Sequence, residues 1–256
     1  METLKNITDF QAQIKVIAVI PAYNEAKHIA RTIIETQQYV DQVIVLDDGS
    51  EDGTDIIARN AGATVIKHEY NQGKGAAINN AFKVARKIQP LAMVLLDGDG
   101  QHDPKEIPFL LEPVLSGQVD MVVGSRFLIN NNIPKYRMLG QNILTMMTNI
   151  GSGIRITDTQ SGFRTFSQKA INKMSFRECG FAVESEMQFK AKQYNLLVTE
   201  VPIVTNYDEK VKRSPIIHGF SVLFRVITLI RTNIGLTILK KFGFKEDETN
   251  EGYSHT

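Results

Sequence analysis

Two aspartates are candidates for metal chemistry, because they lie two residues apart directly after an apolar run. Asp97 and Asp99 belong to the segment DGDGQH, in which Gln101 adds an amide oxygen. Carboxylate and amide oxygens suit divalent cations such as Mg²⁺ and Mn²⁺, and Gly98 lets a ligand approach the backbone closely. A polar turn with two solvated carboxylates is the alternative. We predict a divalent metal at Asp97, Asp99 and Gln101, with diphosphate oxygens completing its coordination.

Three further polar segments carry groups that could contact a nucleotide. In PAYNE, Tyr23 could stack on a base and Glu25 could accept a hydrogen bond from a ribose. In DDGSEDGT, Asp48 could accept from a base N–H or a ribose hydroxyl, although such a turn also caps helices. In NQGKG, Lys74 stands at an expected helix start, where either an anion binds or the glycines simply form a turn.

Other segments could serve a second substrate. Arg126 ends VVGSR and could pair with a phosphate or carboxylate, and residues 127–142 are predicted to form a mobile loop closing on an anionic substrate. In DTQSGFR, Asp158 could be a base, a neighbour of the metal or the partner of an arginine. Glu184 and Glu186 lie at an expected helix start, where acidic residues are favoured in any case.

The elements that must position these groups alternate along the chain. Short unbroken apolar runs, typical of strands buried on both faces, alternate with segments of helical periodicity. This order predicts an α/β fold with a mostly parallel sheet flanked by helices. Ligands bind at the carboxyl ends of such strands, where these polar segments fall. The predicted strands are residues 15–20, 42–46, 63–68, 91–96 and 120–124, and the predicted helices are 25–39, 55–62, 74–88 and 106–115.

Composition excludes several classes of protein. The chain has 256 residues and a net charge of +1, which gives no general reason to bind nucleic acid. A single cysteine excludes an internal disulfide framework and a cysteine-rich zinc site, and it fits a reducing cytosol. The first residues lack the apolar core of a signal peptide. Arg225 and Arg231 interrupt the apolar stretch 216–239, so it does not form a membrane span.

Taken in order, the motifs resemble one enzyme family. PAYNE, DDGSxDGT, GKG, DGDGQHxP, VVGSR and DTQSGFR together resemble the family 2 glycosyltransferases of GT-A fold. Within that family the chain is most similar to the dolichol-phosphate mannose synthase and polyprenyl-phosphate glycosyltransferase branch, over about residues 15–206. It departs from the family at YDEKVKRSP, which keeps the basic charge found there but lacks the glycines.

The resemblance implies roles for individual residues. The metal is expected at Asp97, Asp99 and Gln101, and the catalytic residues are expected to be Asp99, Arg126 and Asp158. The nucleotide-sugar is expected to contact Pro21, Tyr23, Glu25, Asp48, Lys74, Asp97, Gly98, Lys210 and Arg213. The acceptor is expected to contact Arg126, Arg137, Gln160 and Arg164.

The implied reaction is metal-dependent, inverting transfer of a hexose from a UDP- or GDP-sugar to a polyprenyl phosphate. An acceptor phosphate is already anionic, so it needs positioning by cations rather than a strong base. A hydroxyl acceptor would need a base, and Asp158 is the candidate. A nucleotidyltransferase and a non-catalytic binding module are further alternatives.

The chain is expected to divide into a GT-A domain at 14–213, an amphipathic helical segment at 214–244 and a flexible tail at 245–256. The middle segment could pack on the domain, pack on a second subunit, or lie in a membrane interface. A lipid-linked acceptor favours membrane contact, because basic residues suit anionic headgroups. We therefore expect a cytoplasmic protein held peripherally at the membrane, with a homo-oligomer possible.

Overall fold

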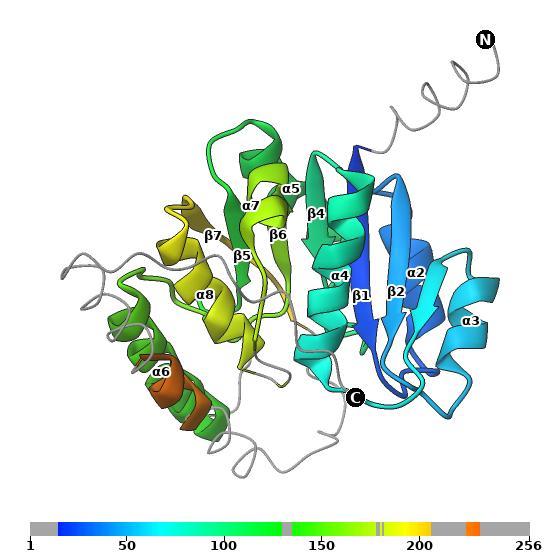
Figure 1. Ribbon diagram of the computed structural model, residues 1–256, viewed down its shortest axis with the longest axis horizontal. Coiled ribbons are helices and arrows are strands. Elements are labelled where there is room, and N and C mark those ends of the chain that lie inside the picture. The colour runs from blue at the N-terminus through cyan, green and yellow to red at the C-terminus, as the bar shows by residue number, and fades with distance from the viewer. Residues whose placement is uncertain (1–14, 130–134, 178–179, 181, 206–223, 231–256) are drawn as a thin grey trace, which may run out of the picture.

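The computed structural model describes residues 15–129, 135–177, 180, 182–205 and 224–230. Its centre is a seven-stranded sheet in the order β3-β2-β1-β4-β6-β5-β7 (Figure 1). All neighbouring strands are parallel except at β6, which runs antiparallel to β4 and β5. The strands are β1 (Val16–Ala22), β2 (Gln42–Asp47), β3 (Thr64–Lys67), β4 (Ala92–Leu95), β5 (Met121–Ser125), β6 (Arg164–Ser167) and β7 (Val198–Pro202).

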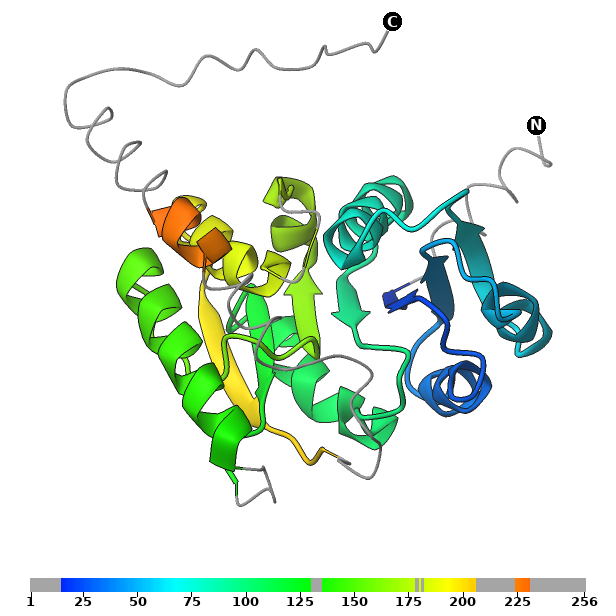
Figure 2. The same ribbon diagram turned by 90° about the horizontal axis from the view of Figure 1, so that it is seen from below.

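Helices cover both faces of this sheet, as Figure 2 shows from below. Strand side chains alternate between the faces, so Ile17 and Val19 join the core under α4, α7 and α8, whereas Ala18 and Ile20 join the core under α2, α3 and α5. The predicted α/β architecture is therefore confirmed. The helices are α2 (Ile29–Thr36), α3 (Thr54–Asn60), α4 (Lys74–Ile88), α5 (Ile107–Leu115), α6 (Lys135–Ser152), α7 (Gln168–Lys173) and α8 (Val183–Gln193), with a short 3₁₀ turn at Pro104–Glu106.

The five predicted strands match β1 to β5, and the sequence patterns missed β6 and β7. Strand β6 begins with a buried arginine and has only four residues, so it lacks the apolar run of a central strand. The expectation of a loop over residues 127–142 was wrong in its second half, because α6 begins at Lys135. Leu144, Thr148 and Ser152 are buried along α6 at four-residue spacing, which is the helical signal.

The helical turn at residues 224–230 packs beside α6 (Figure 2). Val226 is fully buried and belongs to a small core with Leu144 and Ala182, against which Met147 also packs. Phe224 is 71% exposed. Over these seven residues the packing interpretation holds, whereas the rest of segment 214–244 and the tail 245–256 lie outside the described residues. Within the described part of the chain, no helix has the length and apolar character needed to cross a bilayer.

Candidate active site

A largely buried lysine forms ion pairs with two carboxylates from different parts of the chain. Lys74 Nζ donates to Asp97 Oδ1 at 2.6 Å and to Glu184 Oε1 at 2.8 Å. The lysine opens α4, the aspartate follows β4, and the glutamate lies in the first turn of α8. Burial alone would lower the pKa of Lys74, but the two carboxylates outweigh it and raise the pKa above its usual value. In this structure Lys74 thus neutralises protein carboxylates at the position where the sequence predicted an anion.

The two aspartates of DGDGQH differ in their electrostatics. Burial acts to raise the pKa of Asp97, but the charge of Lys74 outweighs it and the pKa is lowered. The pKa of Asp99 is raised, first by burial and then by the charge of Asp97. Asp99 Oδ1 accepts from the backbone N–H of Gln101 at 3.0 Å, which fixes the turn. Among the residues that the structure describes, Asp97 forms an ion pair with a lysine and Asp99 does not.

The donor set of this loop fits a divalent cation that is shared with a ligand. Asp97 is paired with Lys74, which leaves Asp99 and Gln101 to supply oxygens. Among the described residues, no group of three or more His, Cys, Asp and Glu side chains is arranged to hold a metal. A hard cation here would need most of its oxygen ligands from water or from a diphosphate.

The DGDGQH loop packs against Gly162 and Phe163 of the DTQSGFR segment. The His102 ring lies over Phe163 with centroids 5.0 Å apart, and His102 Nδ1 accepts from the backbone N–H of Asp97 at 3.3 Å. Burial lowers the pKa of His102, so its imidazole is neutral at physiological pH. Gly162 lies so close that a Cβ there would stand 2.5 Å from Asp97 Oδ2. The glycine of DTQSGFR therefore makes room for the Asp97 carboxylate.

The segments PAYNE and DDGSEDGT are bound to each other by side chains. Ser50 Oγ accepts from the backbone N–H of Asn24 at 2.9 Å, and Thr54 Oγ1 accepts from that of Glu25 at the same distance. Tyr23 is 37% exposed, and Pro21 is buried within β1. Their expected contacts with a nucleotide stay predictions.

In the structure Asp48 bonds to the protein itself, and its expected contact with a base or ribose stays a prediction. Asp48 is 3% exposed and its oxygens are engaged by the protein itself. Oδ1 accepts from His68 Nδ1 at 2.8 Å and from the Gln72 N–H at 2.9 Å, and Oδ2 accepts from the Gly73 N–H at 2.7 Å. Asn80 Nδ2 lies 2.7 Å from His68 Nε2. Asp48 therefore holds the loop that precedes Lys74.

Asp158 is an arginine partner, one of the three roles that the sequence left open. Arg126 donates from Nε to Asp158 Oδ2 at 2.6 Å and from an Nη to Oδ1 at 2.8 Å. The carboxylate is fully buried. Glu200, on β7, accepts from the backbone N–H groups of Thr157 and Asp158 at 2.7 and 3.0 Å. Sequence patterns missed Glu200, because an acidic residue in a half-buried strand carries no local sign of this role.

Arg164, expected to contact the acceptor, bonds to the protein backbone in the structure. Arg164 is fully buried in β6 and donates to the carbonyl oxygens of Ser161, Glu184 and Thr159 at 2.8, 3.0 and 2.7 Å. Burial lowers its pKa to about 10, and it remains a cation. Arg164 thus fixes the DTQSGFR loop from inside, through the carbonyl oxygens of that loop and of α8.

The other expected acceptor and donor residues are placed only in part. Gln160 Nε2 donates to Thr159 Oγ1 at 3.1 Å and to Ser185 Oγ at 2.9 Å, which holds its amide near the start of α8. Arg137 lies in the first turn of α6, and the structure does not describe its side chain. Lys210 and Arg213 lie outside the described residues.

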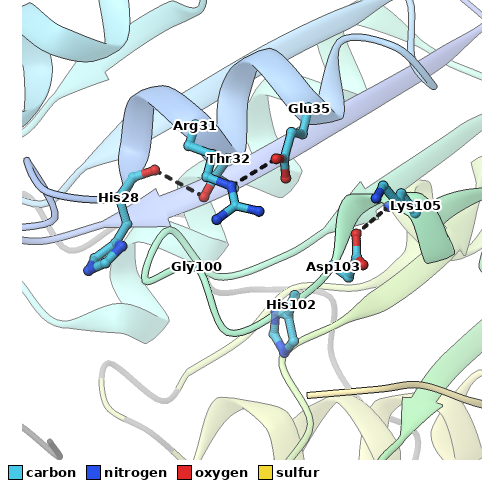
Figure 3. Close-up of a pocket in the computed structure, with 8 residues that line it drawn as sticks. All are labelled: His28, Arg31, Thr32, Glu35, Gly100, His102, Asp103 and Lys105. Carbon is cyan, nitrogen blue, oxygen red and sulfur yellow. Dashed lines mark hydrogen bonds and ion pairs between the residues drawn. The ribbon is translucent and has the colours of Figure 1, made fainter. Parts of the chain in front are cut away.

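A small polar cavity borders the DGDGQH loop on the side of α2 (Figure 3). It has a volume of about 70 Å³, which is far below the several hundred Å³ typical of a nucleotide-sized pocket. Its lining residues are His28, Arg31, Thr32, Glu35, Gly100, His102, Asp103 and Lys105. This cavity is therefore too small to hold a nucleotide-sized ligand.

Comparison with known proteins identifies the class that this fold and site define. Residues 17–180 match the family model described as Glycosyl transferase family 2. The chain belongs to glycosyltransferase family 2 and is a glycosyltransferase.

Its relatives include enzymes named for lipid-phosphate acceptors. The chain is 32% identical over 238 residues to the UDP-N-acetylglucosamine–dolichyl-phosphate N-acetylglucosaminyltransferase of Methanococcus voltae, covering 82% of this chain and 94% of that protein. It is 28% identical over 202 residues to the undecaprenyl-phosphate mannosyltransferase of Micrococcus luteus, covering 74% and 82%. The resemblance to the polyprenyl-phosphate branch is confirmed.

A solved structure supports the fold. The chain aligns with glucosyl-3-phosphoglycerate synthase from Mycobacterium tuberculosis in complex with UDP, with a TM-score of 0.68 and 20% identity, covering 88% of this chain and 83% of that one. This likeness confirms the GT-A architecture.

Proposed function

We propose that the protein transfers a hexose, with inversion, from a UDP- or GDP-sugar to a polyprenyl phosphate, using Mg²⁺ or Mn²⁺. The observation that carries the proposal is the pairing of Asp158 with Arg126. A fully buried carboxylate has both of its oxygens engaged by the guanidinium group and is shielded from substrate. It is therefore badly placed to take a proton from a hydroxyl acceptor. An acceptor phosphate, which is already an anion, needs no such base.

The bond changes of this reaction are simple. A phosphate oxygen of the acceptor attacks the anomeric carbon of the hexose, and the bond from that carbon to the diphosphate breaks. The nucleoside diphosphate leaves with the bonding electrons. The negative charge therefore moves onto the leaving group, and the protein must stabilise it there.

Different residues are proposed to hold the metal, to orient its loop and to bind the acceptor. Asp99 and Gln101 would hold the metal, which supplies positive charge to the leaving diphosphate. Lys74 keeps Asp97 ionised and oriented beside the same loop. Arg126, fixed by Asp158, presents a cation on the acceptor side, and Arg137 and Gln160 are proposed to assist it.

Relatives named for dolichyl and undecaprenyl phosphate acceptors support this acceptor class. The seven described residues 224–230 include Phe224, which is 71% exposed, and Arg225, which is also exposed. We propose that segment 214–244 contacts the cytoplasmic membrane face through such residues. A chain truncated after Pro215 should then sediment less with anionic lipid vesicles than the full chain does, and equal sedimentation would contradict the contact.

Turnover with defined substrates tests the proposal. The protein is incubated with Mg²⁺ or Mn²⁺, a panel of UDP- and GDP-hexoses and a short polyprenyl phosphate, with Asp99→Ala as the control. The expected result is release of a nucleoside diphosphate together with a lipid-phosphate sugar, and its loss in the variant or with EDTA. Release of pyrophosphate would indicate a nucleotidyltransferase. Product formed only with a hydroxyl acceptor would overturn the assigned acceptor and restore Asp158 as the base.

A further inference from the structure

Glu184 carries a buried oxygen whose role the hydrogen bonds of the protein do not explain. Its side chain is 4% exposed, and Oε1 accepts from Lys74 at 2.8 Å. Oε2 is buried and, among the residues that the structure describes, has no hydrogen-bond partner. A buried carboxylate oxygen without a partner costs free energy, so a native structure that keeps one calls for a reason.

Two other carboxylate oxygens in the described part of the chain share this condition, and each has a local explanation. Asp47 Oδ2 lies 3.8 Å from Lys67 Nζ, which compensates its charge. Burial raises the pKa of Glu106 to about 7, so its carboxyl group can carry a proton. Glu184 has neither explanation for Oε2, because its lysine lies on Oε1.

Glu184 lies next to the loop that is proposed to bind the donor. Lys74 joins it to Asp97, which lies on the loop proposed to hold the diphosphate. The exposed fraction of the side chains falls from 25% at Asp97 to 16% at Lys74 and 4% at Glu184. Of these three side chains, Asp97 is the most exposed to solvent and Glu184 is the most deeply buried.

A sugar bound to that diphosphate must lie between this loop and the acceptor side. Arg126 and Asp158 mark the acceptor side, at the ends of β5 and before β6. Glu184 lies at the start of α8, beside the same half of the sheet, and Arg164 donates to its carbonyl oxygen at 3.0 Å. Hydroxyl groups of a hexose are strong partners for a carboxylate in such a desolvated position.

We propose that Glu184 accepts a hydrogen bond from a hydroxyl group of the donor hexose and thereby helps to select the sugar. The inference rests on the proposed function, because it assumes a nucleotide-sugar on the Asp97–Asp99 loop. Lys74 holds the glutamate in position through Oε1, and Oε2 supplies the acceptor atom.

Binding with and without the sugar separates this role from a structural one. UDP, GDP and their hexose conjugates are titrated calorimetrically in the presence of Mn²⁺ against the wild type, Glu184→Gln and Glu186→Gln. Glu186 is a matched control on the same helical turn, where its carboxylate accepts from the Arg177 N–H at 3.0 Å. Glu184→Gln should weaken the binding of the preferred conjugate about tenfold or more, as for loss of a charged hydrogen-bond acceptor. Its affinity for the free diphosphate should change by less than about twofold.

Other results of these titrations would contradict either this inference or the proposed function. Equal weakening of diphosphate and conjugate would overturn the inference, because Glu184 would then act only by supporting Lys74 and Asp97. An unchanged conjugate affinity would also overturn it. If the wild type binds neither ligand, the proposed function fails first, which is a different result. Glu184→Asp, which keeps the charge beside Lys74 but withdraws the carboxylate, should show the same selective loss if the glutamine variant does not fold.

Discussion

The carboxylate of Asp158 and the guanidinium of Arg126 form a bidentate pair, with donor–acceptor distances of 2.6 and 2.8 Å. The Arg126 backbone N–H adds a third hydrogen bond to the same carboxylate at 3.1 Å. The aspartate is fully buried and the arginine side chain is 12% exposed. Removing one partner of such a pair leaves an uncompensated buried charge, which costs more than the pair contributes.

Asp158→Asn should therefore lower the free energy of unfolding by about 3 to 5 kcal/mol. The double variant Arg126→Met, Asp158→Asn should recover part of this loss, because no unpaired charge remains. Urea denaturation of the wild type, both single variants and the double variant measures the coupling. Strictly additive losses would show that the two residues do not act as a pair. For a phosphate acceptor, the folded Asp158→Asn enzyme should also keep the pH dependence of the wild-type rate.

Gly162→Ala should disturb Asp97 selectively. The added Cβ would stand 2.5 Å from Asp97 Oδ2 and 3.0 Å from its carboxyl carbon, so the carboxylate must move away from Lys74. We expect reduced activity with the fold retained, measured by turnover and circular dichroism. Gly140→Ala is the control, because a Cβ there meets nothing within 4 Å and lies on α6. That change should stabilise the helix by up to about 1 kcal/mol and leave the activity unchanged.

His68→Phe should loosen the loop that precedes Lys74. The substitution removes the 2.8 Å bond to Asp48 and leaves Asn80 without its partner on the ring. The expected cost is about 1 to 3 kcal/mol of stability, as for unsatisfied buried polar groups. Hydrogen exchange should become faster at the Gln72 and Gly73 amides, which donate to Asp48. Amides in the middle of α4 serve as the internal control, and a uniform acceleration throughout the protein would contradict a local role.

Glu106 should make stability depend on pH. Burial raises its pKa from 4.5 to about 7 in the folded protein, although the Val204 N–H donates to it at 2.7 Å. The folded state therefore holds this proton more tightly than the unfolded state does. The resulting stability is fully present below pH 4.5 and is lost as pH rises through about 7.

Glu106→Gln lacks this titration. The free energy of unfolding of the variant, compared with that of the wild type, should therefore be higher at about pH 8 than at about pH 5. Urea midpoints at the two pH values measure the difference. Glu112→Gln, which removes an exposed carboxylate from α5, controls for the change in net charge. If both variants show the same difference from the wild type at each pH, burial of Glu106 does not set the dependence.

Local patterns were sufficient for the first five of the seven strands. Strands β1, β2, β4 and β5 are short apolar runs, because burial on both faces of the sheet requires that pattern, whereas β3 is a partly exposed edge strand. The loops after them could also be placed at one edge, because parallel strands share a direction. Strand β6 carries a buried arginine in an antiparallel position, and β7 is only half-buried, so neither has a local signal.

The sequence by itself determined the family, the α/β order and the aspartate pair that follows β4, because each depends on residue types at short fixed spacings. Only the tertiary structure decided what the charged side chains do. Arg164 is buried and donates hydrogen bonds to backbone carbonyl oxygens, and Asp48 accepts hydrogen bonds from the loop that precedes Lys74. Lys74 and Glu184 meet because α4 and α8 cover the same face of the sheet. Such contacts join segments distant in sequence, and a local pattern carries no information about which opposite charge will lie nearest.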